Sequence, residues 1–250
     1  MKNIKTLAIV SGAAGAVGKA FLDAFAVQGC DCIGISRRPI EADHKIVISD
    51  LSDADQTNKV INTIDFRDYE KIIFVHTVGG FKFEVDGKPE IDEDCDGIDD
   101  EVYHGNVDTF KNVVDALITR VVCWQELAIA NIGSISDQFD ICWWRSYSRA
   151  KEAVRVMMRG LVKEESVRCV SLNVSTVKTD KECDLRPFAD MKYWLTAEEL
   201  AEKAMPYLIC PATGYIEVSL FNPMPNFNPV QYYLDPVAIR ERWMREMGKK

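Results

Sequence analysis

Tyr147 and Lys151 are the residues of this 250-residue chain whose types and spacing most clearly allow chemistry. They stand four positions apart, so on a helix both side chains lie on the same face. A free phenol has a pKa of about 10 and is a poor acid–base group at neutral pH, but a neighbouring ammonium favours the phenolate and lowers that pKa. The pair is therefore a candidate proton donor with the group that tunes it.

A serine precedes this pair at a position where open sheets bind their ligands. The apolar run 128–133 is typical of a strand and ends at Ser134, thirteen residues before Tyr147 (147 − 134). At the carboxyl end of a parallel strand, a hydroxyl faces the crevice in which α/β sheets hold small molecules. Ser134 is therefore a third candidate catalytic residue.

Three glycines follow the first apolar run of the chain. The run 7–10 is typical of a buried strand, and the glycines lead from it into an amphipathic helix. Glycines allow a tight turn and the close approach of backbone N–H groups to a diphosphate, which then rests on the positive end of the helix. We therefore expect a dinucleotide to bind at Gly12, Gly15, Ala16, Val17 and Gly18. The alternative is a strand-to-helix turn that binds no ligand.

Two arginines after the second apolar run indicate the kind of dinucleotide. Ser36, Arg37 and Arg38 stand where a protein that binds NAD usually offers a carboxylate to the ribose. Arginine binds a phosphate through two parallel hydrogen bonds, so these residues favour the 2′-phosphate of NADP. All three are predicted cofactor contacts.

Short β-branched runs alternate with longer helical patterns, which predicts a parallel sheet covered by helices. Strands are expected near 6–11, 31–36, 45–48, 71–76, 126–132, 168–173 and 214–220. Helices are expected near 16–28, 52–64, 101–122, 147–164 and 196–207, and a last helix follows Asp235 and Pro236. The predicted fold class is α/β, a single Rossmann-type doubly wound parallel sheet with helices on both faces. We expect one NAD(P)-binding domain over residues 1–250.

In this order along the chain, the glycine turn, Ser134, Tyr147 and Lys151 resemble the short-chain dehydrogenase/reductase family. The resemblance spans most of the chain and implies that Asn106 supports the catalytic lysine through water. It implies further cofactor contacts at Asp50, Leu51, Thr77, Val78, Gly79 and Thr179. Residues 181–200 then correspond to the family's mobile substrate lid. Residues 84–101 form an acidic insertion near the mouth of the site, and residues 221–250 form a C-terminal extension.

The resemblance implies hydride transfer from NADPH to a carbonyl or imine of a small to medium substrate. Tyr147 would donate the proton, Ser134 would orient the reacting atom, and Lys151 would hold the ribose. Aromatic and apolar residues near the pocket by family topology favour a cyclic or aromatic substrate; they are Phe81, Phe83, Phe139, Trp143, Trp144, Phe188, Met191 and Trp194. Two alternatives stay open, a dihydropteridine-type reductase and a non-catalytic NADP-sensing protein of the same fold.

The chain departs from the family pattern in three places. Its glycine spacing is Gly-x-x-Gly-x-x-Gly, Val174 and Ser175 replace the Pro-Gly expected after the sixth strand, and 220–222 lack the family's C-terminal glycines. These departures predict a divergent branch. The glycine spacing, 78–80 and 173–180 loosely resemble dihydropteridine reductases.

Charge and targeting signals argue against several other classes of protein. A net charge of -9 offers no basic face to nucleic acid or a membrane surface. The first apolar run is too short for a signal peptide or a membrane span. We therefore expect a cytoplasmic protein whose partners are a small-molecule carbonyl substrate and copies of itself. The family resemblance implies a homodimer or homotetramer packed through 101–122 and 147–164.

Cysteines and acids do not predict a metal site. The 8 cysteines are scattered without a CxxC pair and are expected to be free thiols. The segment from Asp92 to Gly97 begins like a calcium-binding loop, but Tyr103 stands where the bidentate glutamate is needed. The segment is therefore read as a solvated acidic surface.

Overall fold

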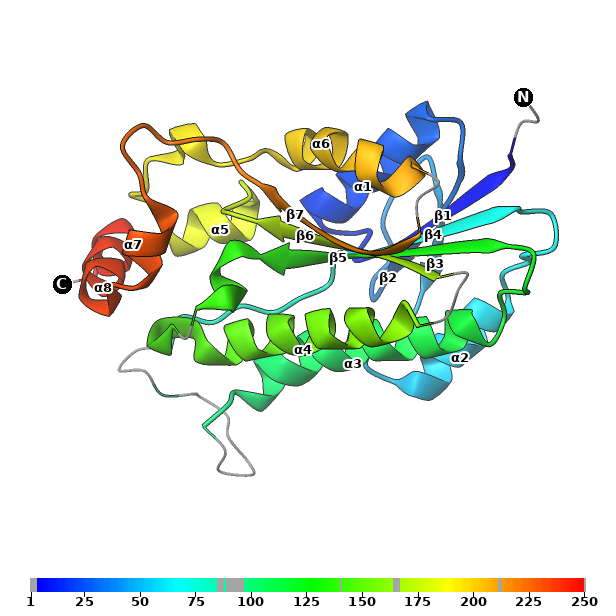
Figure 1. Ribbon diagram of the computed structural model, residues 1–250, viewed down its shortest axis with the longest axis horizontal. Coiled ribbons are helices and arrows are strands. Elements are labelled where there is room, and N and C mark those ends of the chain that lie inside the picture. The colour runs from blue at the N-terminus through cyan, green and yellow to red at the C-terminus, as the bar shows by residue number, and fades with distance from the viewer. Residues whose placement is uncertain are drawn as a thin grey trace.

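The computed structural model describes residues 4–84, 88, 97–139, 141–163, 167–210 and 213–249. The predicted strands form one sheet in the order β3-β2-β1-β4-β5-β6-β7, and every pair of neighbours is parallel (Figure 1). Their bounds are β1 (Thr6–Ser11), β2 (Asp31–Ser36), β3 (Lys45–Ile48), β4 (Lys71–His76), β5 (Glu126–Ser134), β6 (Val167–Val174) and β7 (Gly214–Leu220). The predicted fold class is confirmed.

The central strands are buried on both faces. Every residue of β4 and of β6 is buried, as expected for a parallel sheet that helices cover on both sides. The strand order reverses between β1 and β4, because β2 lies on one side of β1 and β4 on the other. In doubly wound sheets such a reversal opens a crevice at the carboxyl ends of the strands.

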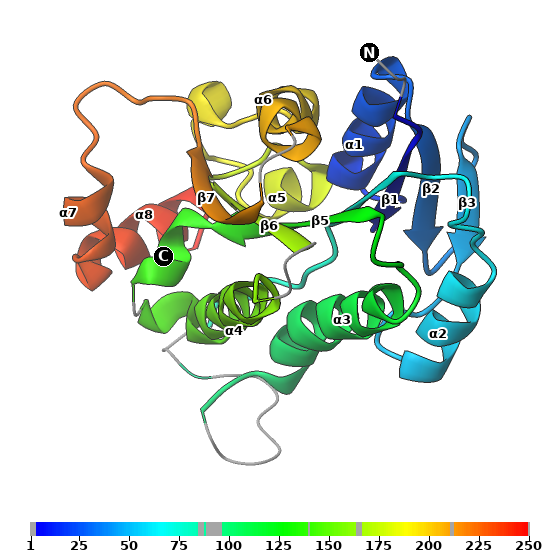
Figure 2. The ribbon, with the colours of Figure 1, turned by 45° about the vertical axis from the view of Figure 1, so that its right-hand side comes forward.

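Helices form a layer on each face of the sheet (Figure 1, Figure 2). Helices α1 (Ala16–Val27) and α6 (Ala197–Ile209) pack together on one face, where Phe21, Phe25 and Leu200 are fully buried. Helices α2 (Ala54–Asn62), α3 (Asp100–Ile118) and α4 (Arg145–Leu161) cover the other face, where Phe110 and Val154 are buried. Each layer thus closes its own apolar core against the sheet.

Helix α4 begins earlier than the sequence predicts, at Arg145 instead of Tyr147. The side chain of Trp144 gives no cap, and the buried carboxylate of Glu84 accepts hydrogen bonds from the backbone N–H groups of Arg145 and Ser146, both at 3.0 Å. A carboxylate at this end is favoured by the helix dipole. The first residue of the predicted acidic insertion is therefore a buried helix cap, not part of a solvated surface.

Several short helices lie beyond the carboxyl ends of the strands, where the sequence predicts a lid and an extension (Figure 1). They include α5 (Asp180–Leu185), α7 (Pro229–Tyr233) and the last helix α8 (Pro236–Glu246), which Asp235 caps as predicted. The described residues also form the 3-10 helices η2 (Ile135–Gln138), η3 (Cys142–Trp144) and η4 (Met191–Tyr193). The calcium-like segment 92–96 lies outside the described residues. Among those described, no helix is long and apolar enough to span a bilayer.

Candidate active site

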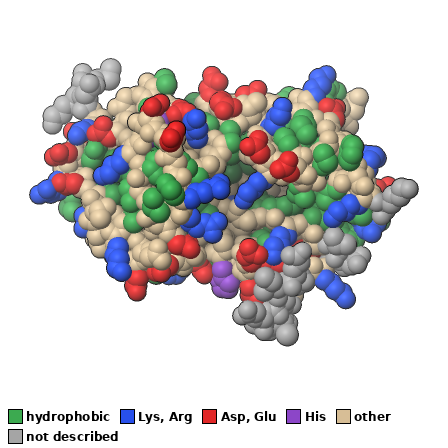
Figure 3. Space-filling view, turned by 180° about the vertical axis from the view of Figure 1, so that it is seen from behind, with side chains coloured by type: hydrophobic (Ala, Val, Ile, Leu, Met, Phe, Trp, Pro, Cys, Tyr) green, Lys and Arg blue, Asp and Glu red, His purple; other side chains and the backbone are tan. Residues whose placement is uncertain are grey.

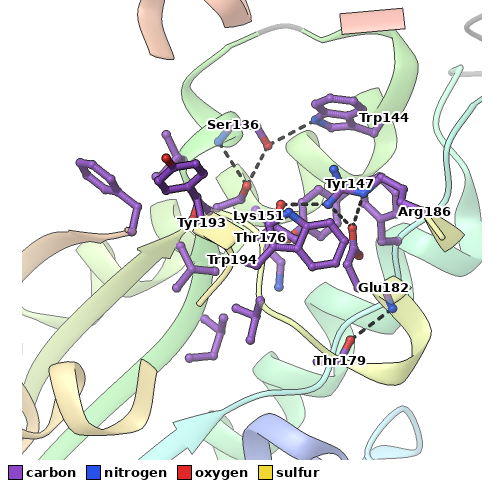
Figure 4. Close-up of a pocket in the computed structure, with 18 of the residues that line it drawn as sticks. Ser136, Trp144, Tyr147, Lys151, Thr176, Thr179, Glu182, Arg186, Tyr193 and Trp194 are labelled. Carbon is purple, nitrogen blue, oxygen red and sulfur yellow. Dashed lines mark hydrogen bonds and ion pairs between the residues drawn. The ribbon is translucent and has the colours of Figure 1, made fainter. Parts of the chain in front are cut away.

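A cavity of about 690 Å³ opens at the carboxyl ends of β5 and β6. Its inner wall contains Ser134, Tyr147 and Lys151, and its outer wall comes from α5, α7 and α8. Figure 4 shows Tyr147 and Lys151 with Glu182 and Arg186 of the outer wall. The three predicted catalytic side chains therefore meet in one cavity. A cavity of this size accommodates a small to medium organic molecule.

Tyr147 and Lys151 are brought together by the first two turns of α4. The Lys151 Nζ lies 5.4 Å from the centre of the Tyr147 ring, and Lys151 is buried. Ser134, which ends β5, lines the same cavity and lowers the pKa of the Tyr147 hydroxyl. The predicted catalytic triplet is thus assembled by one strand end and one helix start.

The pKa of Tyr147 does not follow the expectation that the neighbouring Lys151 lowers it. Burial raises the pKa of Tyr147 well above its usual value, although the Ser134 hydrogen bond acts in the opposite direction. Burial lowers the pKa of Lys151 to about 8, and the negative charge of Asp137 opposes that shift. Tyr147 is therefore protonated at neutral pH, which is the state that a proton donor needs.

Asn106 lies behind Lys151 on α3, as the family resemblance implies. Its Nδ2 donates to the carbonyl oxygens of Gly80 at 2.9 Å and Val102 at 2.7 Å, and the side chain is buried. Its Oδ1 accepts no hydrogen bond from the described residues. A Cβ on Gly79 would lie 2.5 Å from this Oδ1 and 3.1 Å from Lys151 Nζ, so only glycine fits between the two polar groups.

The glycine turn has the geometry of an anion-binding cradle. Gly12 has a φ of +73°, and a Cβ there would lie 2.6 Å from Thr77 Oγ1. A Cβ on Gly18 would overlap the carbonyl of Gly12, so the first turn of α1 is pressed against the loop. Helix α1 begins at Gly15 without a side-chain cap from the described residues and without an acidic residue in its first turn. The predicted site therefore fits a diphosphate.

The other long helices receive an acceptor at their first turn, whereas α1 receives none from the described residues; even α4, whose own N-cap residue Trp144 gives no cap, is capped by Glu84. Side chains cap α2, α3, α6, α7 and α8; they are Asp53, Asp99, Thr196, Asn228 and Asp235. At α1 the positive end stays available for an anion because glycine offers no competing acceptor. At the start of this helix Ala16 is exposed, and the half-buried Val17 lines the cavity.

The other predicted cofactor residues surround this cradle. Arg37 and Arg38 are exposed at the end of β2, whereas Ser36 is buried and its hydroxyl donates to the Arg38 carbonyl at 2.8 Å. Hydrogen bonds from Ser52 hold the pKa of Asp50 below its usual value, and the charge of Arg37 acts in the same direction. The Leu51 side chain belongs to the core, so only its backbone could face a cofactor.

The segment after β4 reaches from the cradle into the cavity. Thr77, Val78 and Gly79 line the cavity, and the Thr77 hydroxyl donates to the Ser11 carbonyl at 2.6 Å. His76 is fully buried next to Ser11, with its Nδ1 3.0 Å from the Ser11 hydroxyl, and burial lowers its pKa to about 3. A neutral imidazole therefore links the ends of β1 and β4.

Thr179 lies at the start of the predicted lid. It caps α5 by accepting from the Glu182 backbone N–H at 3.3 Å, and it lines the cavity (Figure 4). The predicted contact with a nicotinamide is therefore compatible with its position.

The outer wall contains residues that the sequence interpretation did not identify. Arg186 is buried in the lid and donates to Glu182 Oε1 at 2.7 Å, Thr176 Oγ1 at 2.9 Å and Glu246 Oε2 at 3.0 Å. Its guanidinium carbon lies 4.1 Å from the centre of the Trp243 ring. This arginine ties the lid to the C-terminal helix. Its partner Glu246 is sixty residues away, and no local pattern signals the contact.

The aromatic lining differs from the one expected. Phe81, Trp144 and Trp194 line the cavity as predicted. Of the other predicted residues, Phe83, Phe139 and Trp143 pack into an apolar cluster beside the cavity, Phe188 is exposed, and Met191 is not part of the lining. The remaining aromatic lining includes Tyr193 and residues of the C-terminal segment; the latter are Phe221, Phe227, Tyr232, Tyr233 and Trp243.

A doubly wound sheet, a glycine turn and a Tyr–Lys–Ser cavity together define an α/β oxidoreductase. Residues 6–188 match the model of the family described as short chain dehydrogenase, so the chain belongs to the short-chain dehydrogenase/reductase family. Among curated protein sequences, none matches significantly.

Solved structures share the fold at low sequence identity. The ligand-free aldohexose dehydrogenase of Thermoplasma acidophilum has a TM-score of 0.73 and 20% identity, and the match covers 90% of this chain and 98% of that chain. A short-chain type dehydrogenase/reductase of Mycobacterium ulcerans has a TM-score of 0.68 and 19% identity, with 86% and 88% covered. A putative 2-deoxy-d-gluconate 3-dehydrogenase of Agrobacterium tumefaciens with bound NADP has a TM-score of 0.69 and 16% identity, with 87% and 96% covered.

Proposed function

We propose that this chain is an NADPH-dependent reductase of carbonyl or imine compounds with Tyr147 as the proton donor. The observation that carries the proposal is the meeting of Tyr147, Ser134 and Lys151 in one cavity beside the glycine cradle. A bound nicotinamide dinucleotide would supply the hydride. The remaining requirements are a proton and a donor that polarises the substrate heteroatom, and the chain has residues for both.

Four neighbouring side chains would supply and transfer the proton that the reduction needs. Tyr147 is protonated at neutral pH and would donate to the substrate oxygen or nitrogen. Ser134, hydrogen-bonded to Tyr147, would orient the same atom. Lys151 would hold the ribose, and Asn106, which flanks Gly79 together with Lys151, would extend the path toward solvent.

The preference for NADP rests on Arg37 and Arg38. Both are exposed at the end of β2, and a guanidinium binds a phosphate through paired hydrogen bonds. The Agrobacterium relative holds NADP in the same fold, which supports the assignment. The 2′-phosphate of the cofactor is expected between these two side chains.

The cavity walls favour a cyclic or aromatic substrate. Phe81, Trp144 and Trp243 line it, and their rings pack against one another at centroid distances of 4.9–6.0 Å. The charges of the outer wall are paired, Arg186 with Glu182 and Glu246. Stacking and apolar contact are then the main interactions left for a ligand.

Turnover assays test this function directly. NADPH and NADH oxidation would be followed with isatin, acetophenone, cyclohexanone and quinonoid dihydropterin as substrates. We expect reduction of the aromatic ketones, with kcat/KM at least about tenfold higher for NADPH than for NADH. Preferred turnover of the dihydropterin would instead favour the pteridine reductase alternative. Tight NADPH binding without any turnover would favour the non-catalytic alternative.

We further propose a cytoplasmic homodimer or homotetramer packed through α3 and α4, without nucleic-acid or membrane partners. The two helices lie side by side on one face of the sheet. The net charge of -9 and the acidic and basic side chains spread over one face (Figure 3) agree with the lack of a nucleic-acid partner. Light scattering of the purified protein measures the assembly, and a monomeric mass at assay concentration would contradict it.

A further inference from the structure

Ser134 is joined to a second serine and to a tryptophan by a chain of buried hydrogen bonds. Its Oγ lies 2.7 Å from the Oγ of Ser136 and also accepts from the Ser136 backbone N–H at 3.1 Å. The indole Nε1–H of Trp144 donates to Ser136 Oγ at 3.2 Å (Figure 4). Residues from β5, η2 and η3 thus form one connected chain that ends in the cavity.

The direction of this chain follows from what each group can donate. An indole N–H only donates, so Ser136 Oγ is an acceptor toward Trp144. Either hydroxyl of the Ser134–Ser136 pair can donate, and the arrangement in which Ser136 donates gives its proton an acceptor among the described residues, Ser134 Oγ. A hydroxyl oxygen has two acceptor sites, and on Ser134 the N–H and the O–H of Ser136 fill both. The remaining hydroxyl proton of Ser134 is therefore directed toward Tyr147 and the cavity.

We propose that Ser136 and Trp144 are positioning residues that fix Ser134 as a hydrogen-bond donor toward the substrate heteroatom. The inference rests on the proposed reductase function and assigns it two further residues. A donor that is oriented beforehand needs no reorganisation when charge develops on the substrate oxygen. Successive hydrogen bonds also polarise one another, so the Ser134 proton becomes a better donor than an isolated hydroxyl would offer.

Without the Ser136 side chain, the Ser134 hydroxyl would lose the hydrogen bond that fixes the direction of its own proton. It would keep no partner on the protein side except Tyr147, and its proton could rotate away from the cavity. The Ser134 hydrogen bond lowers the pKa of Tyr147, as expected if Ser134 donates to the phenol oxygen. Ser136, which also lines the cavity, would therefore act on the reaction through the orientation of Ser134.

A double-mutant cycle tests this dependence. The rate of isatin reduction with NADPH would be measured for S134A, S136A and the S134A/S136A double variant. We expect S136A to lower kcat about tenfold with KM within about twofold. In the S134A background the second substitution should change kcat by less than about twofold, because Ser136 has no remaining donor to position. Additive losses in the double variant would overturn the proposal, since they would indicate a structural role.

Two tryptophan variants provide a matched comparison. W144F removes the indole N–H and keeps a ring in the cavity wall, and we expect a kcat loss of about threefold. W143F removes an indole N–H that donates to the Pro236 carbonyl at 2.8 Å, outside the chain of serines, and it should leave kcat unchanged. Equal losses of kcat in the two variants would contradict the inference.

If the wild-type protein reduces no carbonyl compound, the proposed function fails. The hydrogen bond from Trp144 to Ser136 can then still be tested by a measurement that needs no turnover. Exchange of the indole N–H groups with solvent would be followed by NMR in protein labelled with nitrogen-15 at tryptophan. The Trp144 signal, assigned with W144F, should exchange at least about tenfold more slowly in the wild type than in S136A. Equal exchange rates would overturn the proposed hydrogen-bond chain.

Discussion

At the scale of single residues, the charge of Lys151 depends on a second buried group, Asp137. Asp137 on η2 forms an ion pair with Arg155 Nη1 at 3.4 Å, and neither carboxylate oxygen accepts a hydrogen bond within the described part of the chain. Burial raises the pKa of Asp137 to about 6, so it carries a negative charge at pH 7. Burial lowers the pKa of Lys151 and the charge of Asp137 raises it, and with both effects present the pKa is about 8. Asp137 thus keeps Lys151 charged in the working range of pH.

The pH dependence of kcat/KM on the alkaline side, its alkaline limb, should report on the charge of Lys151 and on its neighbour Asp137. In the proposed mechanism Lys151 acts as a cation, so kcat/KM should fall as the pH rises through about 8. D137N removes the negative charge that raises the Lys151 pKa, and the limb should move to lower pH. E152Q, a change on the exposed side of α4, should leave the limb in place. The hypothesis fails if folded D137N retains the wild-type limb.

At the scale of elements, the start of α4 determines where Tyr147 and Lys151 stand. Its cap is supplied by Glu84, 61 residues before Arg145 in the chain, and not by a neighbouring side chain. The two hydrogen bonds satisfy the N–H groups of Arg145 and Ser146, which the helix itself leaves unpaired. The first residue of the predicted acidic insertion is thus joined to the helix that positions Tyr147 and Lys151.

Removal of this cap should weaken the fold measurably. We expect E84A to lower the free energy of unfolding by about 1–2 kcal/mol, because two buried N–H groups lose their acceptor and the helix dipole loses a compensating charge. E202A, at an exposed position of α6, should change it by less than about 0.5 kcal/mol. Denaturant titration measures both values, and a loss in E84A no larger than in E202A would show that Glu84 is not the cap.

At the scale of the whole molecule, the C-terminal segment closes the cavity that the central sheet opens. Trp243 of α8 lies 4.9 Å from Trp144 between ring centres, and Arg186 holds Glu246 of the same helix. Arg186 also lies 4.7 Å from the centre of the Trp194 ring. Residues 181–200 and the C-terminal segment therefore form one connected wall, and residues such as Trp243 line the cavity.

Breaking this connection should separate substrate binding from cofactor binding. R186M leaves Glu246 buried with Arg242 as its remaining cationic partner, and we expect a loss of about 3 kcal/mol in the free energy of unfolding. The KM for isatin should rise several-fold, while the Kd of NADPH, which binds at the glycine cradle, should stay within about twofold. R245M, at an exposed position of α8, is the control. An unchanged KM in R186M would exclude this role of the wall.

The sequence predicts the sheet and the inner wall well because both depend on local signals. The apolar runs of the strands and the four-residue spacing of Tyr147 and Lys151 are visible without tertiary information. The outer wall depends on pairs far apart in the chain, such as Arg186 with Glu246 and Glu84 with Ser146, which periodicity does not reveal. Ser136 is a local exception, because a second serine two residues after Ser134 can be read directly. The direction of the Ser136 hydrogen bond depends on the contact with Trp144, which the sequence does not reveal.

We propose Tyr147 as the proton donor, and a comparison of two tyrosine variants tests this role. The kcat of isatin reduction would be measured for Y147F and for Y207F, whose altered ring lies on α6 away from the cavity. We predict that Y147F lowers kcat by at least about a hundredfold with an unchanged Kd for NADPH, whereas Y207F retains wild-type activity. Full activity in Y147F would contradict the account.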